Sequence, residues 1–281
     1  MPELPDIDVY VERLEALLSR EVLEQVRLRS VFVLRTADPP LSDLHGRMLT
    51  KVRRLGKQIV LGFEGQLFAV IHLMTSGRLR WRSPAAAIPK ENGLAAFDFG
   101  NGTVLFTETS KKKRASLRVV TGETELAALH RGGLEVLEAS FEAFAARLRE
   151  QNHTLKRALT DQRIFSGIGN AYSDEILHLA RLSPAKRTAQ ISDDNLQTLF
   201  DATCETLLTW RERLLEQCGE EFPKTSQHFA RRWPCMAGLV SPVRRVASKF
   251  DASSMPKMSL TTAPGARPKA DYWLTVSYRD G

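Results

Sequence analysis

The chain begins MPELPD, and its second and third residues form a pair that could do covalent chemistry. A small second residue permits removal of Met1, which would leave Pro2 with a free secondary amine. An α-amino group has a pKa of about 7.7–8.0, so part of it is unprotonated near neutral pH and can attack a carbonyl-like carbon. Glu3 would lie beside that nucleophile and could move protons. The alternative is that Pro2 and Pro5 only precede a helix, as proline often does, and for six residues alone this alternative is the stronger one.

A second informative stretch is SGIGNAYSDEILHLARLSP, residues 166–184. Gly167 and Gly169 predict a tight turn, and Asn170 then lies at the start of a helix. Side-chain and backbone donors at such a start can bind a phosphate. The alternative is an ordinary helical hairpin with a glycine turn, which this stretch alone would favour.

The elements that must position these residues fall into two groups. Apolar residues at helical spacing from Ile7 to Leu18 predict a first helix. Residues 22–120 hold short apolar runs separated by turn signals such as GNGT, which predicts an antiparallel sandwich or barrel. A short helix at GETELAALHRGG and a linker follow, and residues 140–217 have a helical pattern. The expected fold class is therefore α+β, with a β domain followed by a helical domain.

Several motifs together resemble the formamidopyrimidine-DNA glycosylase/endonuclease VIII family. They are PELPDID at the N-terminus, RLGKQIVL at 54–61, IHLMTSG at 71–77 and LKRALTDQRIFSGIGNAYSDEIL at 155–177. The resemblance covers residues 2–224 and implies an N-terminal helix with a β-sandwich, then a helix–two-turn–helix domain. We expect domains at 1–131 and 132–224, with an aberrant tail at 225–281. The implied function is base excision repair by a bifunctional DNA glycosylase and abasic-site lyase that acts on oxidised bases.

The resemblance also implies roles for single residues. Pro2 would attack C1′ of the damaged nucleotide and expel the base, and Glu3 would shuttle protons during ring opening and β-elimination, with δ-elimination as a further step. No metal or organic cofactor is needed for this chemistry, because the amine acts as the electron sink. The base must leave the stack to be reached. Lys57 would lie near the active site against the DNA backbone, although a solvated lysine at a strand end is the alternative.

The remaining site residues that the resemblance implies are expected to contact DNA: His72, Met74, Thr75, Lys111, Lys113, Lys156 and Asn170. A histidine satisfied within the core is the alternative for His72. Asp6 and Asp8 stand where the family usually has glutamate. TSKKKRA stands where the family often has an arginine and an aromatic wedge, so wedging by an apolar side chain is in doubt. The preference for oxidised purines or pyrimidines stays open.

Composition restricts the partners. The net charge is +7, but Thr225–Gly281 carries nine Lys/Arg against three Asp and no Glu, so residues 1–224 are almost neutral. DNA binding by that part must depend on local patches such as Lys111–Arg114. Neither a membrane span nor a signal peptide is recognisable, and the three cysteines fit neither a disulfide framework nor a zinc site. We expect a cytoplasmic monomer that binds damaged double-stranded DNA.

The tail departs most from the family, which ends in a zinc finger of pattern C-x2-C-x16-C-x2-C. Here the tail has one cysteine, so no zinc ion is expected. In a second reading frame, each codon consists of the last base of one codon and the first two bases of the next. That frame permits cysteine at four junctions with this spacing, and at some other positions it requires residues like those of the family. This favours out-of-frame translation of Thr225–Gly281, and a genuinely zincless finger is the alternative.

Two other functions stay open beside the repair enzyme. One is a non-catalytic DNA-binding remnant, in which loss of the finger abolishes productive base flipping. The other is a helix–two-turn–helix module that binds structured RNA, which would leave the Pro2–Glu3 pair unexplained.

Overall fold

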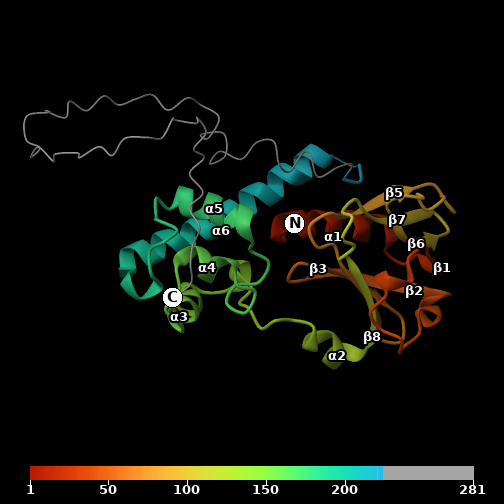
Figure 1. Ribbon diagram of the computed structural model, residues 1–281, viewed down its shortest axis with the longest axis horizontal. Coiled ribbons are helices and arrows are strands. Elements are labelled where there is room, and N and C mark those ends of the chain that lie inside the picture. Colours follow the sequence, from red (N-terminus) through yellow and green to blue (C-terminus); the bar gives the residue numbers. More distant parts are fainter. Residues whose placement is uncertain (220, 224–281) are drawn as a thin grey trace, which may run out of the picture. The chain divides into compact units, whose positions relative to one another are not determined.

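The computed structural model describes residues 1–219 and 221–223, which belong to one compact unit, Met1–Ser241 (Figure 1). The proposals for Thr225–Gly281, an out-of-frame tail without zinc, lie outside the described residues. Helix α1 (Leu4–Leu18) precedes eight strands. The strands are β1 (Val22–Leu28), β2 (Arg47–Leu55), β3 (Gln58–Phe63), β4 (Leu67–His72), β5 (Gly77–Arg82), β6 (Gly93–Phe99), β7 (Gly102–Glu108) and β8 (Ser116–Thr121).

The strands form a wholly antiparallel sheet in the order β5-β7-β6-β1-β2-β3-β4-β8. Strands β1 and β2 pair only at Val22 with Met48 and Leu23 with Arg47, so this junction joins two four-stranded halves. Leu23 and Phe97 from one half share a hydrophobic core with Leu61 from the other. The two halves therefore pack as the expected β-sandwich, and each buries one face in the other.

Helix α1 is amphipathic, and its apolar residues enter this same core. Ile7, Tyr10, Leu14 and Leu18 are buried among the strands, as their helical spacing predicts. Leu4, one turn earlier, belongs instead to the core of the helical region, and its N–H donates to the Gly167 carbonyl at 3.0 Å. The first turn of α1 thus lies where the two cores meet, and it carries Pro2 and Glu3 to that place.

The helical region follows the short helix α2 (Gly122–Ala128). It contains α3 (Phe141–Arg149), α4 (Leu155–Thr160), α5 (Asn170–Leu179) and the long α6 (Asp193–Cys218), and Figure 1 shows them gathered as one group. Short 3-10 turns lie at Val31–Val33, Leu41–Leu44, Val136–Glu138 and Thr188–Gln190. Ser140, Thr154 and Ser192 cap α3, α4 and α6 by accepting a backbone N–H, which satisfies donors that the first turn leaves free. Their apolar faces enclose a second core with Phe144, Phe165 and Trp210.

Candidate active site

Glu3 is almost fully buried at 3% exposure, and its carboxylate lies at the N-terminus of α5. It accepts hydrogen bonds from the backbone N–H groups of Gly169 at 2.7 Å, Ala171 at 3.1 Å and Tyr172 at 3.3 Å. These donors and the positive end of the helix stabilise the negative charge. The backbone donors expected to bind a phosphate here are therefore taken by Glu3, whereas Asn170 itself is exposed.

Asp6, in the first turn of α1, binds the backbone of Glu3. Its Oδ2 accepts the backbone N–H of Glu3 at 2.8 Å, and its Oδ1 is buried without a partner among the described residues. Burial raises the pKa of Asp6 to about 7, and the charge of Glu3 adds to this, against the Glu3 N–H bond. Asp6 is thus about half-protonated near neutral pH. In the protonated molecules no second negative charge lies beside Glu3.

The chain terminus lies beside these two carboxyl groups. Pro2 is buried, while Met1 is half-exposed and lines a pocket of about 310 Å³. Burial lowers the pKa of the Met1 α-amino group below its usual value, and Glu3 opposes that shift. An amine in this place is unprotonated more often at neutral pH, which is the state that a nucleophile requires.

Lys57 lines the same pocket from the turn between β2 and β3, and it is only 7% exposed. Burial lowers the pKa of its ammonium group, with Glu3 raising it and Arg131 lowering it further. A Cβ added at Gly169 would collide with both the Glu3 carboxylate and the Lys57 Nζ. Glu3 and Lys57 therefore approach each other against a glycine that has no room for a side chain.

His72, at the end of β4, also lines the pocket. Its Nδ1 accepts the backbone N–H of Met74 at 3.0 Å, and Met74 turns the chain with a positive φ of 52°. Burial, with help from Arg131 and Lys57, lowers the pKa of His72 to about 4. The ring is therefore neutral at pH 7, and because Nδ1 accepts, Nε2 carries the proton and is a donor.

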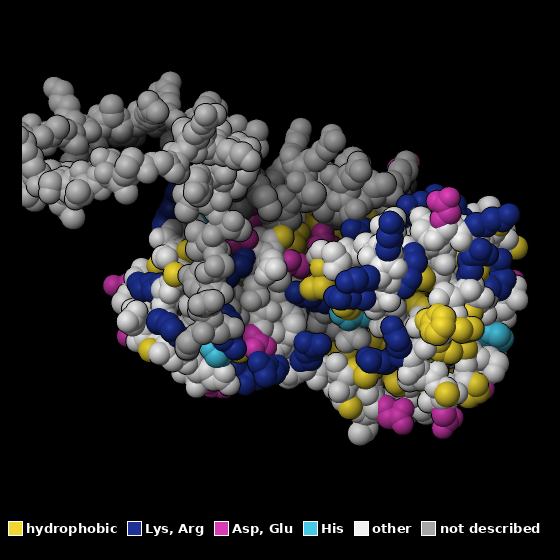
Figure 2. Space-filling view, viewed as in Figure 1, with side chains coloured by type: hydrophobic (Ala, Val, Ile, Leu, Met, Phe, Trp, Pro, Cys, Tyr) yellow, Lys and Arg dark blue, Asp and Glu magenta, His cyan; other side chains and the backbone are white. Residues whose placement is uncertain are grey.

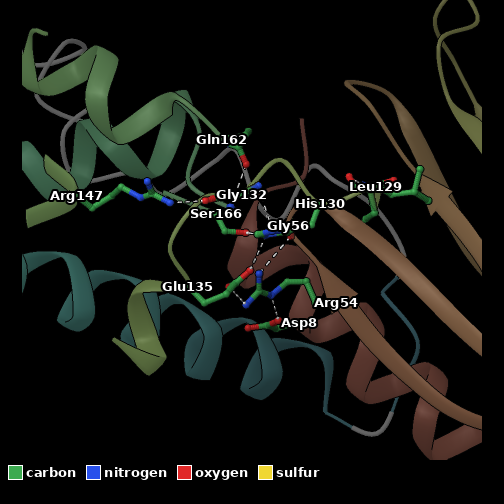
Figure 3. Close-up of polar contacts among 12 residues, drawn as sticks. Asp8, Arg54, Gly56, Leu129, His130, Gly132, Glu135, Arg147, Gln162 and Ser166 are labelled. Atoms are coloured by element: carbon green, nitrogen blue, oxygen red, sulfur yellow. Dashed lines mark hydrogen bonds and ion pairs between the residues drawn. The ribbon is translucent and has the colours of Figure 1, made fainter. Parts of the chain in front are cut away.

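Behind the pocket, Arg54 of β2 joins three segments (Figure 3). Its Nε donates to Asp8 of α1 at 2.8 Å and its Nη2 to Glu135 at 2.8 Å, while Nη1 reaches the Gly56 carbonyl at 3.3 Å. The Arg54 side chain is 13% exposed, so the surrounding solvent screens these pairs little. We call Arg54, Asp8 and Glu135 the Arg54 ion-pair cluster. It fixes the start of the helical region against α1 and the sheet.

The other DNA-contact candidates lie in two further places. Lys156 of α4 donates to the Asn170 carbonyl at 2.6 Å and pairs with Asp174 at 2.5 Å, so the structure brings Lys156 and Asn170 together at the start of α5. Neither lines the pocket. Thr75 and Lys111 are exposed on loops.

Lys113 donates to the Glu108 carbonyl. Sequence reasoning did not identify Glu108 as the residue that anchors the loop of Lys113. The buried carboxylate of Glu108 accepts the backbone N–H groups of Arg114 and Ala115, and Ser76 donates to it at 3.5 Å. Glu108 thus holds the loop of Lys111 and Lys113 beside the loop of Thr75. Its only signal in the sequence was an acidic residue three positions before a basic run.

Comparison with known families identifies both regions of the chain. The family model described as the formamidopyrimidine-DNA glycosylase N-terminal domain matches residues 1–115, and its H2TH domain model matches residues 133–212. A formamidopyrimidine-DNA glycosylase of Solibacter usitatus is 33% identical over 209 residues, which cover 74% of this chain and 76% of the relative. The chain belongs to the formamidopyrimidine-DNA glycosylase family. The domain boundary between residues 131 and 132 remains our proposal.

Other members of the formamidopyrimidine-DNA glycosylase family are also similar. The enzyme of Moorella thermoacetica is 29% identical, covering 77% of this chain and 78% of its own. Among solved structures, a Lactococcus lactis Fpg in complex with DNA containing an abasic site aligns with a TM-score of 0.69 and 20% identity, over 75% of this chain and 79% of that one. A complex of the wild-type Lactococcus lactis protein with DNA containing an oxidised pyrimidine gives the same TM-score. These structures share the fold.

Three basic residues that sequence reasoning missed also line the pocket of this family member: Arg118 of β8, His130 and Arg131. They come from segments far from PELPD in the sequence, and no motif singled them out. Within residues 1–219 and 221–223, no cluster of His, Cys, Asp or Glu could hold a metal ion, and no helix is long and apolar enough to cross a membrane. The zinc ligands of the family's finger would fall in the tail, where one cysteine stands, so the expected lack of zinc stays a prediction.

Proposed function

We propose that this chain is a DNA glycosylase and abasic-site lyase that removes oxidised bases and cleaves the strand through a Schiff base on Pro2. The observation that carries the proposal is the position of Glu3, buried beside the chain terminus and held by three amides of α5. Family membership supports glycosylase chemistry, and the DNA complexes of similar folds support damaged DNA as the substrate.

The first step joins the nucleophile to the sugar. With Met1 removed, the Pro2 nitrogen uses its lone pair to attack C1′, and the C1′–base bond breaks with its electrons leaving on the base. The Glu3 carboxylate takes the proton that the Pro2 nitrogen then loses and passes it to the sugar ring oxygen, so the nitrogen lone pair opens the ring and gives an iminium ion between Pro2 and C1′. Lys57 and the neutral His72 present N–H donors in the same pocket, where negative charge on the departing group can be stabilised.

The second step cleaves the strand. The iminium ion acidifies the C2′ hydrogens, so the Glu3 carboxylate can take one of them as a base. The electrons released form the C2′–C3′ double bond, and the 3′ phosphate leaves with the C3′–O bond electrons. A further elimination can release the 5′ phosphate, and water then hydrolyses the iminium ion with or without that elimination. Pro2 is returned as a free amine in both cases.

Borohydride reduction tests this proposal, because it converts the iminium ion into a stable amine. The full chain incubated with abasic-site duplex and borohydride should give a covalent adduct, which peptide mapping places on Pro2. Pro2→Leu is the matched variant: a large second residue keeps Met1 in place, so the secondary amine is never exposed and the Pro2 adduct should disappear.

Two results would contradict the proposal. An adduct on Lys57 would move the nucleophile to another residue. A wild-type chain that binds the duplex but forms no adduct at high enzyme concentration would instead be a non-catalytic DNA-binding protein.

A further inference from the structure

The pocket beside Glu3 has more positive charge than the proposed chemistry uses. Lys57, Arg118 and Arg131 all line it, with the donor His72 among them. Figure 2 shows Lys and Arg side chains gathered in the middle of the face that it draws. The charge of Arg131 is felt by two groups, since it lowers the pKa of both Lys57 and His72, and Arg118 acts on His72 as well. These residues are therefore close neighbours in space.

Among the described residues, some arginines are neutralised by a carboxylate, whereas Arg118 and Arg131 are not. Arg27, Arg53 and Arg54 each pair with a carboxylate. In the described part of the chain, neither the Arg118 nor the Arg131 side chain has an ion-pair or hydrogen-bond partner. Like charges placed together without a counter-charge raise the free energy of the free protein. An anion that enters the pocket would remove this repulsion.

The segment that carries Arg131 is held from both sides. Gly132 donates its N–H to His130 Nδ1 at 3.2 Å, and its carbonyl accepts from Arg147 of α3 at 2.6 Å. Figure 3 shows Gly132 beside Arg147, and a Cβ at Gly133 would collide with the Gln162 carbonyl, so this backbone packs tightly on the helical region. The exposed Arg131 side chain thus extends from a fixed backbone, which reduces the entropy lost when it binds.

We propose that Arg131, assisted by Arg118, binds a backbone phosphate next to the damaged nucleotide and so holds the strand against Lys57. The planar guanidinium matches phosphate oxygens in a two-pronged bond, and such contacts fix the register of the strand without reading its sequence. The inference rests on the proposed function, because it places the nucleotide under attack in this pocket. Arg131 is then a positioning residue for the strand.

A binding experiment with neutralised linkages tests this. The duplex contains a tetrahydrofuran abasic analogue, which cannot be cleaved, and one methylphosphonate at a time replaces each phosphate near it. Arg131→Gln should weaken binding to the all-phosphate duplex about tenfold and reduce the salt slope of log Kd by about one. At one linkage, neutralisation should weaken the wild type but leave Arg131→Gln unaffected.

Two further variants sharpen the result. Arg131→Lys keeps the positive charge but lacks the planar guanidinium that forms two parallel hydrogen bonds to a phosphate. It should therefore keep the salt slope and lose part of the affinity. Lys51→Gln removes one exposed positive charge from β2 outside this pocket, and it should leave both quantities as in the wild type.

Borohydride trapping in parallel separates this inference from the proposed function. Suppose that the wild type traps abasic DNA but Arg131→Gln has the salt slope of the wild type, or that the affinity losses from Arg131→Gln and from neutralisation are additive at every linkage. Either result overturns the inference and leaves the lyase proposal intact. If Arg131→Gln shows the single-linkage effect and the wild type forms no adduct, the phosphate contact stands and the lyase chemistry fails. A wild type that does not bind the duplex overturns both.

Discussion

Asp6 is a buried carboxyl group whose proton is linked to folding. Burial raises its pKa to about 7 in the folded chain, against 3.8 as its ordinary value. Between about pH 4 and 7 the unfolded chain releases this proton while the folded chain keeps it, so the free energy of unfolding falls as the pH rises. Asp6→Asn cannot ionise and should lose this dependence. Urea unfolding should show the variant gaining on the wild type by a few kcal/mol between pH 5 and pH 8.

Asp161→Asn is the control for Asp6, since Arg163 bonding lowers the pKa of Asp161 to about 2. Asp161 is ionised in both states above pH 5, so its substitution should change the stability equally at pH 5 and pH 8. If the free energy of unfolding changes with pH in the same way for Asp6→Asn and the wild type, then Asp6 is ionised in the folded chain.

Lys57 is a buried cation whose partner in the free protein is the charge of Glu3. Lys57→Met keeps the length of the side chain and removes the N–H donors. Because charge develops on the departing base only during excision, the variant should slow excision about a hundredfold and cleavage of a preformed abasic site much less. Single-turnover rates on the two duplexes measure this, with the exposed Lys90→Met as control. Equal losses in both assays would make Lys57 a general DNA contact.

At the scale of elements, the junction of Gly169 with α5 determines the active-site geometry. A side chain at this residue would push apart Glu3 and Lys57. Gly169→Ala should therefore reduce the rate of excision about a hundredfold, because displacements near 1 Å have effects of that size. Gly100→Ala is the matched control, since its added Cβ would meet only ordinary contacts. Single-turnover excision and thermal unfolding measure the effects, and an unchanged rate in Gly169→Ala would contradict the assigned roles.

Local signals predicted the elements well. The apolar spacing from Ile7 to Leu18 predicted α1, and Gly167 and Gly169 predicted a helix that starts at Asn170, where α5 does start. Such signals lie within one or two turns of chain. The partner of the α5 amides could not be found in this way, because Glu3 is far away in the sequence.

The same limit applies to the pocket and its loops. Glu108 organises two loops through bonds to Ser76 and Ala115, and Arg131 reaches the pocket because the sheet and the helical region pack together. Neither placement follows from the spacing of residue types. The motifs located Lys57 and His72 because a family resemblance contains long-range information that periodicity lacks.

At the scale of the whole molecule, the Arg54 ion-pair cluster couples the two cores. Arg54→Met would leave Asp8 and Glu135 half-buried without their cation, at 20% and 28% exposure. We expect a loss of about 3 kcal/mol in the free energy of unfolding, since an orphaned buried charge is strongly destabilising. Hydrogen exchange should show α5 and α6 losing protection before the strands.

Arg149→Met is the control for this cluster, because Arg149 and Asp193 form an exposed pair. Its loss should be below about 1 kcal/mol. If Arg54→Met keeps equal protection in the helices and the strands, the cluster does not couple the cores.

The burial of Pro2 has a practical consequence for handling this protein. Hydrogen bonds hold the first residues in place: Leu4 donates to Gly167 and Glu3 donates to Asp6. Met1 already lines the pocket. An affinity tag or fluorescent label fused ahead of Met1 would have to leave through the space where a nucleotide is proposed to sit, and it would replace the secondary amine by an amide. A preparation purified on such a tag should look well folded and be inert until a protease restores proline as the first residue.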